Sequence, residues 1–198
     1  MEDVKSIISQ RLRRAPAGRI VTPKEFLSVG SRTAVDKTFS RLAAAGKVIR
    51  VARGMYVAPQ ESEFGPYPPS AEKVVNSYGK ITGERIVPSG ARAANNLGLT
   101  TQVPVEEVFL TTGKARTLML GRRKVFLKHA PSWQTAMPNS RVGEAIRAIA
   151  HMGPQRAASF AKAVRSKLTA GEWEQVSRMK PSVPAWMVNA INEAELAN

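Results

Sequence analysis

Apolar residues at the start of the chain recur at the spacing of an amphipathic helix. Four of them between positions 4 and 12 predict a first helix, and Pro16 ends it. The stretch Thr22-Pro23-Lys24-Glu25 matches a capping box with proline at the first helical position. It therefore predicts a second helix, which runs as far as Gly30.

A third helix is predicted from Ser31, a favoured N-cap residue, through Ala45. Its apolar residues Val35, Phe39 and Leu42 fall on one side, which we expect to face a core. The opposite side carries polar residues: Thr33, Lys37, Ser40 and Arg41.

Two short runs suited to β-strands follow this helix. Residues 48–51 and 55–57 are rich in β-branched and large apolar side chains, and Gly54 lies in the turn between them. Three helices followed by a hairpin is the order of a winged helix-turn-helix. In such a module the third helix enters the DNA major groove, which is about 12 Å wide, and the hairpin lies beside it.

A proline-rich stretch then interrupts the pattern. Four of the twelve residues from Pro59 to Ser70 are prolines, so we predict a linker over residues 59–69. The linker would separate a winged helix in residues 1–58 from a second domain in residues 70–198. Beyond the linker the pattern predicts helices over 70–82 and 91–97, strands over 108–112, 117–120 and 125–128, and helices from about residue 141.

The predicted fold class is therefore α+β, with an N-terminal winged helix-turn-helix and a mixed α/β module that ends in a helical region. No run of apolar residues is long enough to span a membrane. The first residues also lack the pattern of a signal peptide, so we expect a soluble, cytoplasmic protein.

Charge directs attention to the first of these domains. The chain has 30 Lys and Arg residues against 15 Asp and Glu residues, a net charge of +15, and over half of the excess lies in residues 1–54. A polyanion, and nucleic acid above all, is the partner that such a balance favours. The alternative is that the polar face of the third helix is exposed to solvent and binds nothing. The helix order, the hairpin and the local charge favour nucleic acid binding over this alternative. The predicted DNA-contacting residues are Ser31, Arg32, Thr33, Lys37, Ser40, Arg41, Arg50 and Arg53.

A second cationic segment is predicted at the turn between the last two strands. Arg122, Arg123 and Lys124 follow Gly121 there. The segment is either a solvated turn or an additional contact to nucleic acid phosphates, and the sequence leaves both open.

The composition also weighs against enzymatic chemistry. The absence of cysteine excludes zinc fingers and thiol nucleophiles, and two Asp and two His residues offer little for a metal site. Ser89, His129 and His151 stand without the partners that a catalytic group needs. We expect no enzymatic activity, no metal and no cofactor.

Two segments resemble a known family. Residues 34–42 (AVDKTFSRL) and 45–56 (AGKVIRVARGMY) resemble the winged-helix domain of AbiEi-type antitoxins, whose regulators carry a similar DRALSRL…GxIxRVxRGxY pattern. Residues 87–104 (VPSGARAANNLGLTTQVP) resemble the segment that opens the second domain of that family.

The resemblance implies an antitoxin and transcriptional repressor from a type IV toxin–antitoxin, or phage-defence, operon. Such a protein binds inverted repeats of double-stranded DNA in its own promoter and counteracts a nucleotidyltransferase-like toxin, without a general need for direct contact between the two proteins. A different class remains open from the residues themselves, an RNA-binding regulator that uses the winged helix and the basic turn. Few aromatic residues lie among the basic ones, which disfavours binding of single strands by stacking.

Overall fold

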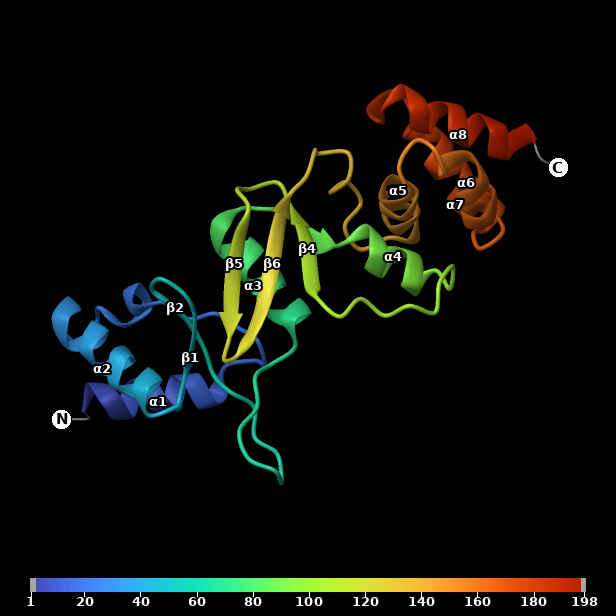
Figure 1. Ribbon diagram of the computed structural model, residues 1–198. Coiled ribbons are helices and arrows are strands. Elements are labelled where there is room, and N and C mark those ends of the chain that lie inside the picture. The colour runs from blue at the N-terminus through green and yellow to red at the C-terminus, as the bar shows by residue number, and fades with distance from the viewer. Residues whose placement is uncertain (1–2, 197–198) are drawn as a thin grey trace. The chain divides into compact units, whose positions relative to one another are not determined.

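The computed structural model describes residues 3–196, and its fold is α+β (Figure 1). The α-helices of this part of the chain are α1 (Val4–Arg14), α2 (Arg32–Ala44), α3 (Ala71–Thr82), α4 (Gly90–Asn96), α5 (Arg141–Met152), α6 (Ala157–Arg165), α7 (Ala170–Arg178) and α8 (Ala185–Leu196). Two short 3₁₀ helices are η1 (Pro23–Phe26) and η2 (Lys180–Ser182). The strands are β1 (Ile49–Ala52), β2 (Met55–Val57), β3 (Ile86–Pro88), β4 (Glu107–Thr111), β5 (Arg116–Leu120) and β6 (Arg123–His129).

The strands form two sheets, and the chain forms two compact units. β1 and β2 pair with each other, and the other four strands have the order β3-β4-β6-β5. β3 runs antiparallel to β4 with Ile86 opposite Thr111. The first unit contains the chain up to Glu84 together with residues 116–126, and the second contains residues 85–115 and the chain from Leu127 onward. Each unit is therefore assembled from two separate stretches of sequence.

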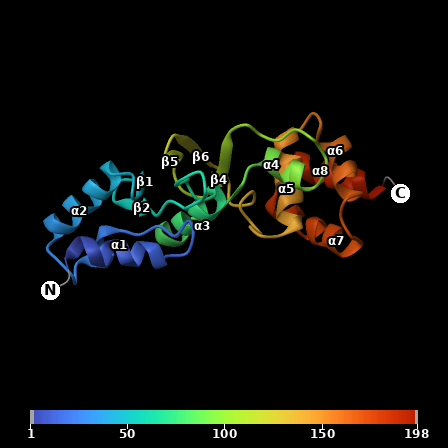
Figure 2. The same cartoon turned by 90° about the horizontal axis from the view of Figure 1, so that it is seen from below.

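α2 has the limits and the buried side that the sequence predicts. The Ser31 hydroxyl caps the helix by accepting a hydrogen bond from the backbone N–H of Ala34, and Gly46 follows the helix with a φ of +67°. Figure 2 shows α1 and α2 side by side. The core of this region consists of Ile8, Leu12, Val21, Phe26, Val35, Phe39, Leu42, Val48 and Tyr56.

The predicted second helix is wrong in its length and type. The capping box is present, with the backbone N–H of Thr22 donating to Oε1 of Glu25 at 2.7 Å, but only the four residues of η1 are helical. The backbone N–H of Val29 still bonds to the carbonyl of Phe26, three residues earlier, which is 3₁₀ rather than α-helical spacing. The tighter turn accompanies burial of the Phe26 ring against α2 and close packing of Gly30 on Val4.

α3 packs in the first unit, although the sequence places it beyond the predicted linker. The backbone N–H of Ile20 donates to the Ser77 hydroxyl of α3 at 2.8 Å. Gly18, with a φ of +79°, lies so close to α3 that a Cβ would come within 2.5 Å of the Lys73 Cβ. The compact units therefore do not separate at residues 59–69, because α3 is held by residues that precede the first hairpin.

The second unit contains α4 and the helices predicted from about residue 141, which the structure confirms as α5 to α8. Its core includes Val142, Ile146 and Ile149 of α5 together with Trp173 of α7 and Ile191 of α8. β3 was not predicted, since its three residues are too few to show an alternating pattern.

Ionic hydrogen bonds connect the last helices. Lys180 donates to a carboxylate oxygen of Glu195 at 2.7 Å, and the Ser177 hydroxyl donates to the other oxygen. These bonds, that of Lys180 first, hold the pKa of Glu195 below its ordinary value. At the start of α7, the backbone N–H of Thr169 similarly keeps the pKa of Glu172 low in a capping box.

The core of the second unit holds one arginine. Arg147 of α5 is 1% exposed, and none of its three guanidinium nitrogens has a hydrogen-bond partner among residues 3–196. Burial lowers the pKa of Arg147 to about 10, while the Glu144 carboxylate acts in the opposite direction. Because this value is well above 7, the side chain carries its charge in the core at neutral pH.

Across residues 3–196, none of the helices has both the length and the apolar character that crossing a membrane requires.

The close approach of α4 to α5 gives a first prediction. A Cβ at Gly90 would lie 2.4 Å from the backbone oxygen of Arg147 and 2.6 Å from the Cβ of His151. Gly90→Ala should therefore force the two helices apart and lower the free energy of unfolding by about 1–3 kcal/mol, measured by urea denaturation. Gly171→Ala in α7 is the matched control, because nothing lies within 4 Å of its Cβ position. It should leave stability unchanged or raise it by up to about 1 kcal/mol. Equal stability of the Gly90→Ala protein and the unmodified protein would contradict the packing described here.

The buried arginine gives a second prediction. Arg147→Met keeps much of the side-chain volume and removes the buried charge, so it should raise the free energy of unfolding at pH 7 by about 1–4 kcal/mol. Arg147→Lys is the control, because it keeps a charge in the same place and should bring no such gain. A loss of stability in the methionine variant would show that the guanidinium has a stabilising partner outside the contacts described above.

Candidate nucleic-acid interface

The outer side of α2 presents the polar residues that the sequence singles out. Thr33, Lys37 and Ser40 are exposed, and they lie on the side opposite the buried residues Val35 and Phe39. Successive residues of an α-helix are about 100° apart, so positions 33, 37 and 40 fall within one narrow sector. Arg41 lies at the edge of that sector and is also exposed. The structure thus brings these four predicted side chains together on one surface.

Three of the predicted residues are already engaged in local bonds. Nε of Arg32 donates to a carboxylate oxygen of Asp36 at 2.7 Å, and the Ser40 hydroxyl donates to the Asp36 carbonyl at 2.9 Å. The Ser31 hydroxyl accepts from the Ala34 N–H at 3.3 Å. An exposed ion pair such as Arg32–Asp36 contributes about 0–1 kcal/mol, so a phosphate can compete with Asp36 for this arginine.

The other basic residues predicted to contact DNA are exposed, and within residues 3–196 none of them forms an ion pair. They are Lys37, Arg41, Arg50 and Arg53. Arg50 lies in β1, opposite Tyr56 of β2, and Arg53 lies in the turn, where Gly54 has a φ of +69°.

The hairpin is fixed to α2 through the core. Val21 forms an isolated antiparallel bridge with Tyr56, with reciprocal backbone hydrogen bonds of 2.8 Å and 3.0 Å. The Tyr56 ring stacks on Phe39 of α2 with 4.7 Å between the ring centroids. Because Phe39 lies on the buried side of α2, this contact sets the hairpin beside the helix and leaves its outer side free.

The turn between β5 and β6 belongs to the same compact unit as α2 and the hairpin. Arg122, Arg123 and Lys124 are all exposed there. Nη2 of Arg123 donates to the carbonyl of Pro69 at 3.4 Å, and Gly121 lies against Pro68. The sequence could not show this proximity, because some fifty residues separate the two segments.

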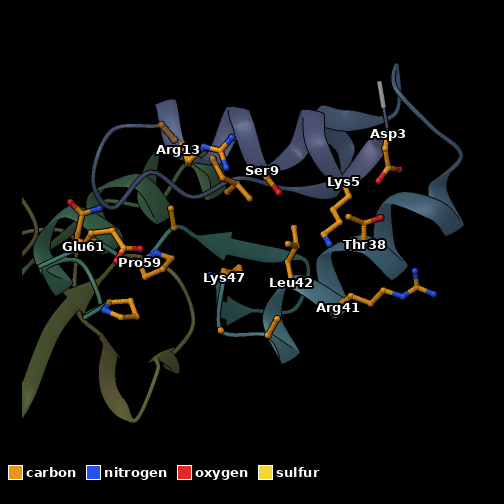
Figure 3. Close-up of a pocket in the computed structure, with 17 residues that line it drawn as sticks. Asp3, Lys5, Ser9, Arg13, Thr38, Arg41, Leu42, Lys47, Pro59 and Glu61 are labelled. Atoms are coloured by element: carbon orange, nitrogen blue, oxygen red, sulfur yellow. The ribbon is translucent and has the colours of Figure 1, made fainter. Parts of the chain in front are cut away.

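A groove beside α2 was missed at the level of sequence. It has a volume of about 990 Å³ and lies between α1, α2 and the chain after β2 (Figure 3). Its charged lining residues are Asp3, Lys5, Arg13, Arg41, Lys47 and Glu61. The signal that marks it is the spacing of Lys5, Ser9 and Arg13, four residues apart along α1, which places them in a row on one side of that helix.

Of the three residues considered for catalysis, Ser89 and His129 contact the backbone nearby. The Ser89 hydroxyl caps α4 by accepting from the N–H of Arg92, and Nδ1 of His129 lies 2.9 Å from the carbonyl oxygen of Gly113. His151 is exposed near the end of α5. Over residues 3–196 no three His, Asp or Glu side chains are grouped so that they could hold a metal ion.

Comparison with known proteins places most of the chain in one family. The model described as "Family of unknown function (DUF6088)" matches residues 7–172. This range contains every helix and strand that forms the candidate interface, and it ends near the start of α7. No curated protein matches the chain.

Proposed function

The chain belongs to DUF6088, a family of unknown function, and we propose that residues 1–58 form a winged helix-turn-helix that binds double-stranded DNA. The observation that carries this proposal is the exposed, polar and cationic side of α2, next to a hairpin with Arg53 in its turn. With 13 residues, α2 is about 20 Å long, and its width suits a major groove of about 12 Å. In this proposal η1 takes the place of the second helix, and Phe26 of η1 packs on Phe39 at the buried side of α2.

The proposed contacts divide into two kinds. Thr33, Lys37, Ser40 and Arg41 face base edges in the major groove and supply specificity. Ser31, Arg32, Arg50 and Arg53 lie at the start of α2 and on the hairpin, where they meet phosphates and supply affinity.

We further propose that the protein is a transcriptional repressor and the antitoxin of a type IV toxin–antitoxin operon. The resemblance of residues 34–56 and 87–104 to AbiEi-type antitoxins supports this role. The second segment contains most of β3 and all of α4. It belongs to the second unit, whereas the proposed DNA-binding residues belong to the first. A neighbouring reading frame for a nucleotidyltransferase-like toxin, whose growth inhibition this protein relieves on co-expression, would bear out the proposal. Continued growth inhibition would contradict the antitoxin role. It would not bear on the DNA-binding proposal, which the titrations below test.

A second candidate function is RNA binding, which the basic turn at Arg122 and Lys124 favours because it lies in the same unit as α2. Titration of the full chain with promoter duplex and with structured RNA, at matched salt, separates the two. Tighter binding of the duplex supports the DNA-binding proposal, and tighter binding of the RNA supports the alternative.

The reading of bases gives a third prediction. Lys37 is exposed at the middle of the outer side of α2, so Lys37→Ala should cost about 1–3 kcal/mol of binding free energy on the true operator and less on random DNA. The measurement is fluorescence anisotropy on both duplexes, with circular dichroism to confirm folding. Operator discrimination that survives this substitution would remove Lys37 from the proposed base contacts.

Phosphate contact gives a fourth prediction, at the hairpin turn. Arg53→Ala should weaken binding to operator and random DNA equally. It should also reduce the slope of log affinity against log salt by about 1, because one fewer counterion is released. Lys162→Ala is the control: it removes one exposed charge from α6, in the second unit, and should leave that slope unchanged. Equal slopes for the Arg53→Ala and Lys162→Ala proteins would place Arg53 outside the DNA contact.

A further inference from the structure

We propose that the groove beside α2 receives the loop formed by residues 60–67 of a second copy of this chain, so that two copies form a symmetric dimer. This inference concerns the protein without nucleic acid, and it stands apart from the proposed DNA binding. The loop is called the acidic loop below, because it contains Glu61 and Glu63 and no basic residue.

The groove combines a cationic rim with an apolar lining. Figure 3 shows Lys5 reaching from α1 toward α2, with Arg13 farther along the same helix and Arg41 on the other wall. Lys5 and Arg13 are eight residues apart, which is about 12 Å along the helix axis. The apolar lining consists of Leu12, Ala15, Leu42, Ala45, Ala58, Pro59 and Pro66. A ligand that matches this groove carries both negative charge and apolar surface.

The acidic loop has both properties, and its shape is fixed before any contact with a partner. Gln60 and Tyr67 exchange backbone hydrogen bonds of 2.8 Å in both directions, and the Ser62 hydroxyl donates to the Gly65 carbonyl at 2.9 Å. At the tip, the Phe64 side chain is 93% exposed, and Tyr67 is 48% exposed. Large aromatic side chains that are held on a rigid segment are typical anchors of protein interfaces, because little conformational entropy is lost when they bind.

The position of the loop favours a second copy as the occupant. Gln60, Glu61 and Pro66, at the base of the acidic loop, line the groove of their own chain, whereas the tip with Phe64 does not. Four residues in extended conformation reach about 13 Å, so the tip can extend beyond the groove of its own chain. A two-fold axis at the mouth of the groove would place each tip in the groove of the other copy, which is the reciprocal arrangement of an isologous dimer.

Nucleic acid fits the groove less well. Its lining residues include no aromatic side chain on which a base could stack. Thr38 and Leu42, which line the groove, also project from a different side of α2 than Lys37. The groove is therefore separate from the proposed base-reading surface, apart from Arg41 at the boundary of both.

The first test is the oligomeric state of the full chain without nucleic acid, measured by sedimentation equilibrium over a concentration series. The unmodified chain should be a dimer, and Phe64→Ser should raise the dimer dissociation constant at least tenfold. Phe64 is almost fully exposed, so this variant should fold normally, which circular dichroism checks. Lys80→Glu is the control for the charge substitutions described next, because Lys80 is exposed on α3 and lies outside both the groove and the loop. A chain that is monomeric at every concentration, or a dimer that Phe64→Ser leaves unchanged, would overturn the proposal.

A charge exchange provides the sharper test. Glu63→Lys in the loop and the double substitution Lys5→Glu with Arg13→Glu in the groove should each weaken self-association. An equimolar mixture of the two variants should associate again, because both loop–groove contacts of a mixed dimer then join opposite charges. Failure of the mixture to associate would overturn the assignment of loop to groove. If the groove variant instead remains dimeric and loses affinity for duplex DNA, the groove is a phosphate-binding surface, which also contradicts the proposal.

Discussion

The Phe39 ring holds together the part of the chain that carries the candidate interface. It stacks on Tyr56 of the hairpin and meets Phe26 of η1 edge-on, with 5.5 Å between the ring centroids. Each such pair contributes about 0.5–1.5 kcal/mol beyond the burial of apolar area. Arg11 of α1 in turn lies over the Phe26 ring and donates to the carbonyl of Glu25. Phe39 thus contacts η1, which precedes α2 in the sequence, and β2, which follows it. These two contacts together determine the rotation of α2 about its own axis. The direction in which Lys37 points follows from that rotation.

Local signals in the sequence were enough to predict most of the helices and strands. The cap at Ser31 and the glycine at position 54 each act within a few residues, and the structure confirms the elements that they delimit. The capping box at Thr22 was also real, yet it could not show that burial of Phe26 would limit the segment to one 3₁₀ turn. Exposure of the eight residues predicted to contact DNA follows from the helical period and the hairpin turn, whereas the contact itself remains a prediction.

Features that depend on distant pairs of residues were not predictable from the sequence. The hydrogen bond from Ile20 to Ser77 joins positions more than fifty residues apart, and it places α3 with the N-terminal helices rather than beyond a linker. The groove has the same origin, because its walls come from α1, α2 and the chain after β2. Charge shows the same limit. Arg32 and Arg41 of α2 are exposed, so solvent screens their charges, whereas Arg147 is buried in the core without such screening. Nothing in the local sequence distinguishes the two situations.

The two compact units alternate along the chain, and this order constrains how the protein is made. The first unit needs residues 116–126, which a ribosome adds only after the first stretch of the second unit, residues 85–115. The N-terminal helices therefore leave the ribosome before the strands that complete their unit, and the second unit must wait for α5 to α8. For the same reason no single cut of the polypeptide releases both units intact. Between residues 84 and 127 the chain passes from one unit to the other three times, so neither unit is complete until the other has been partly translated.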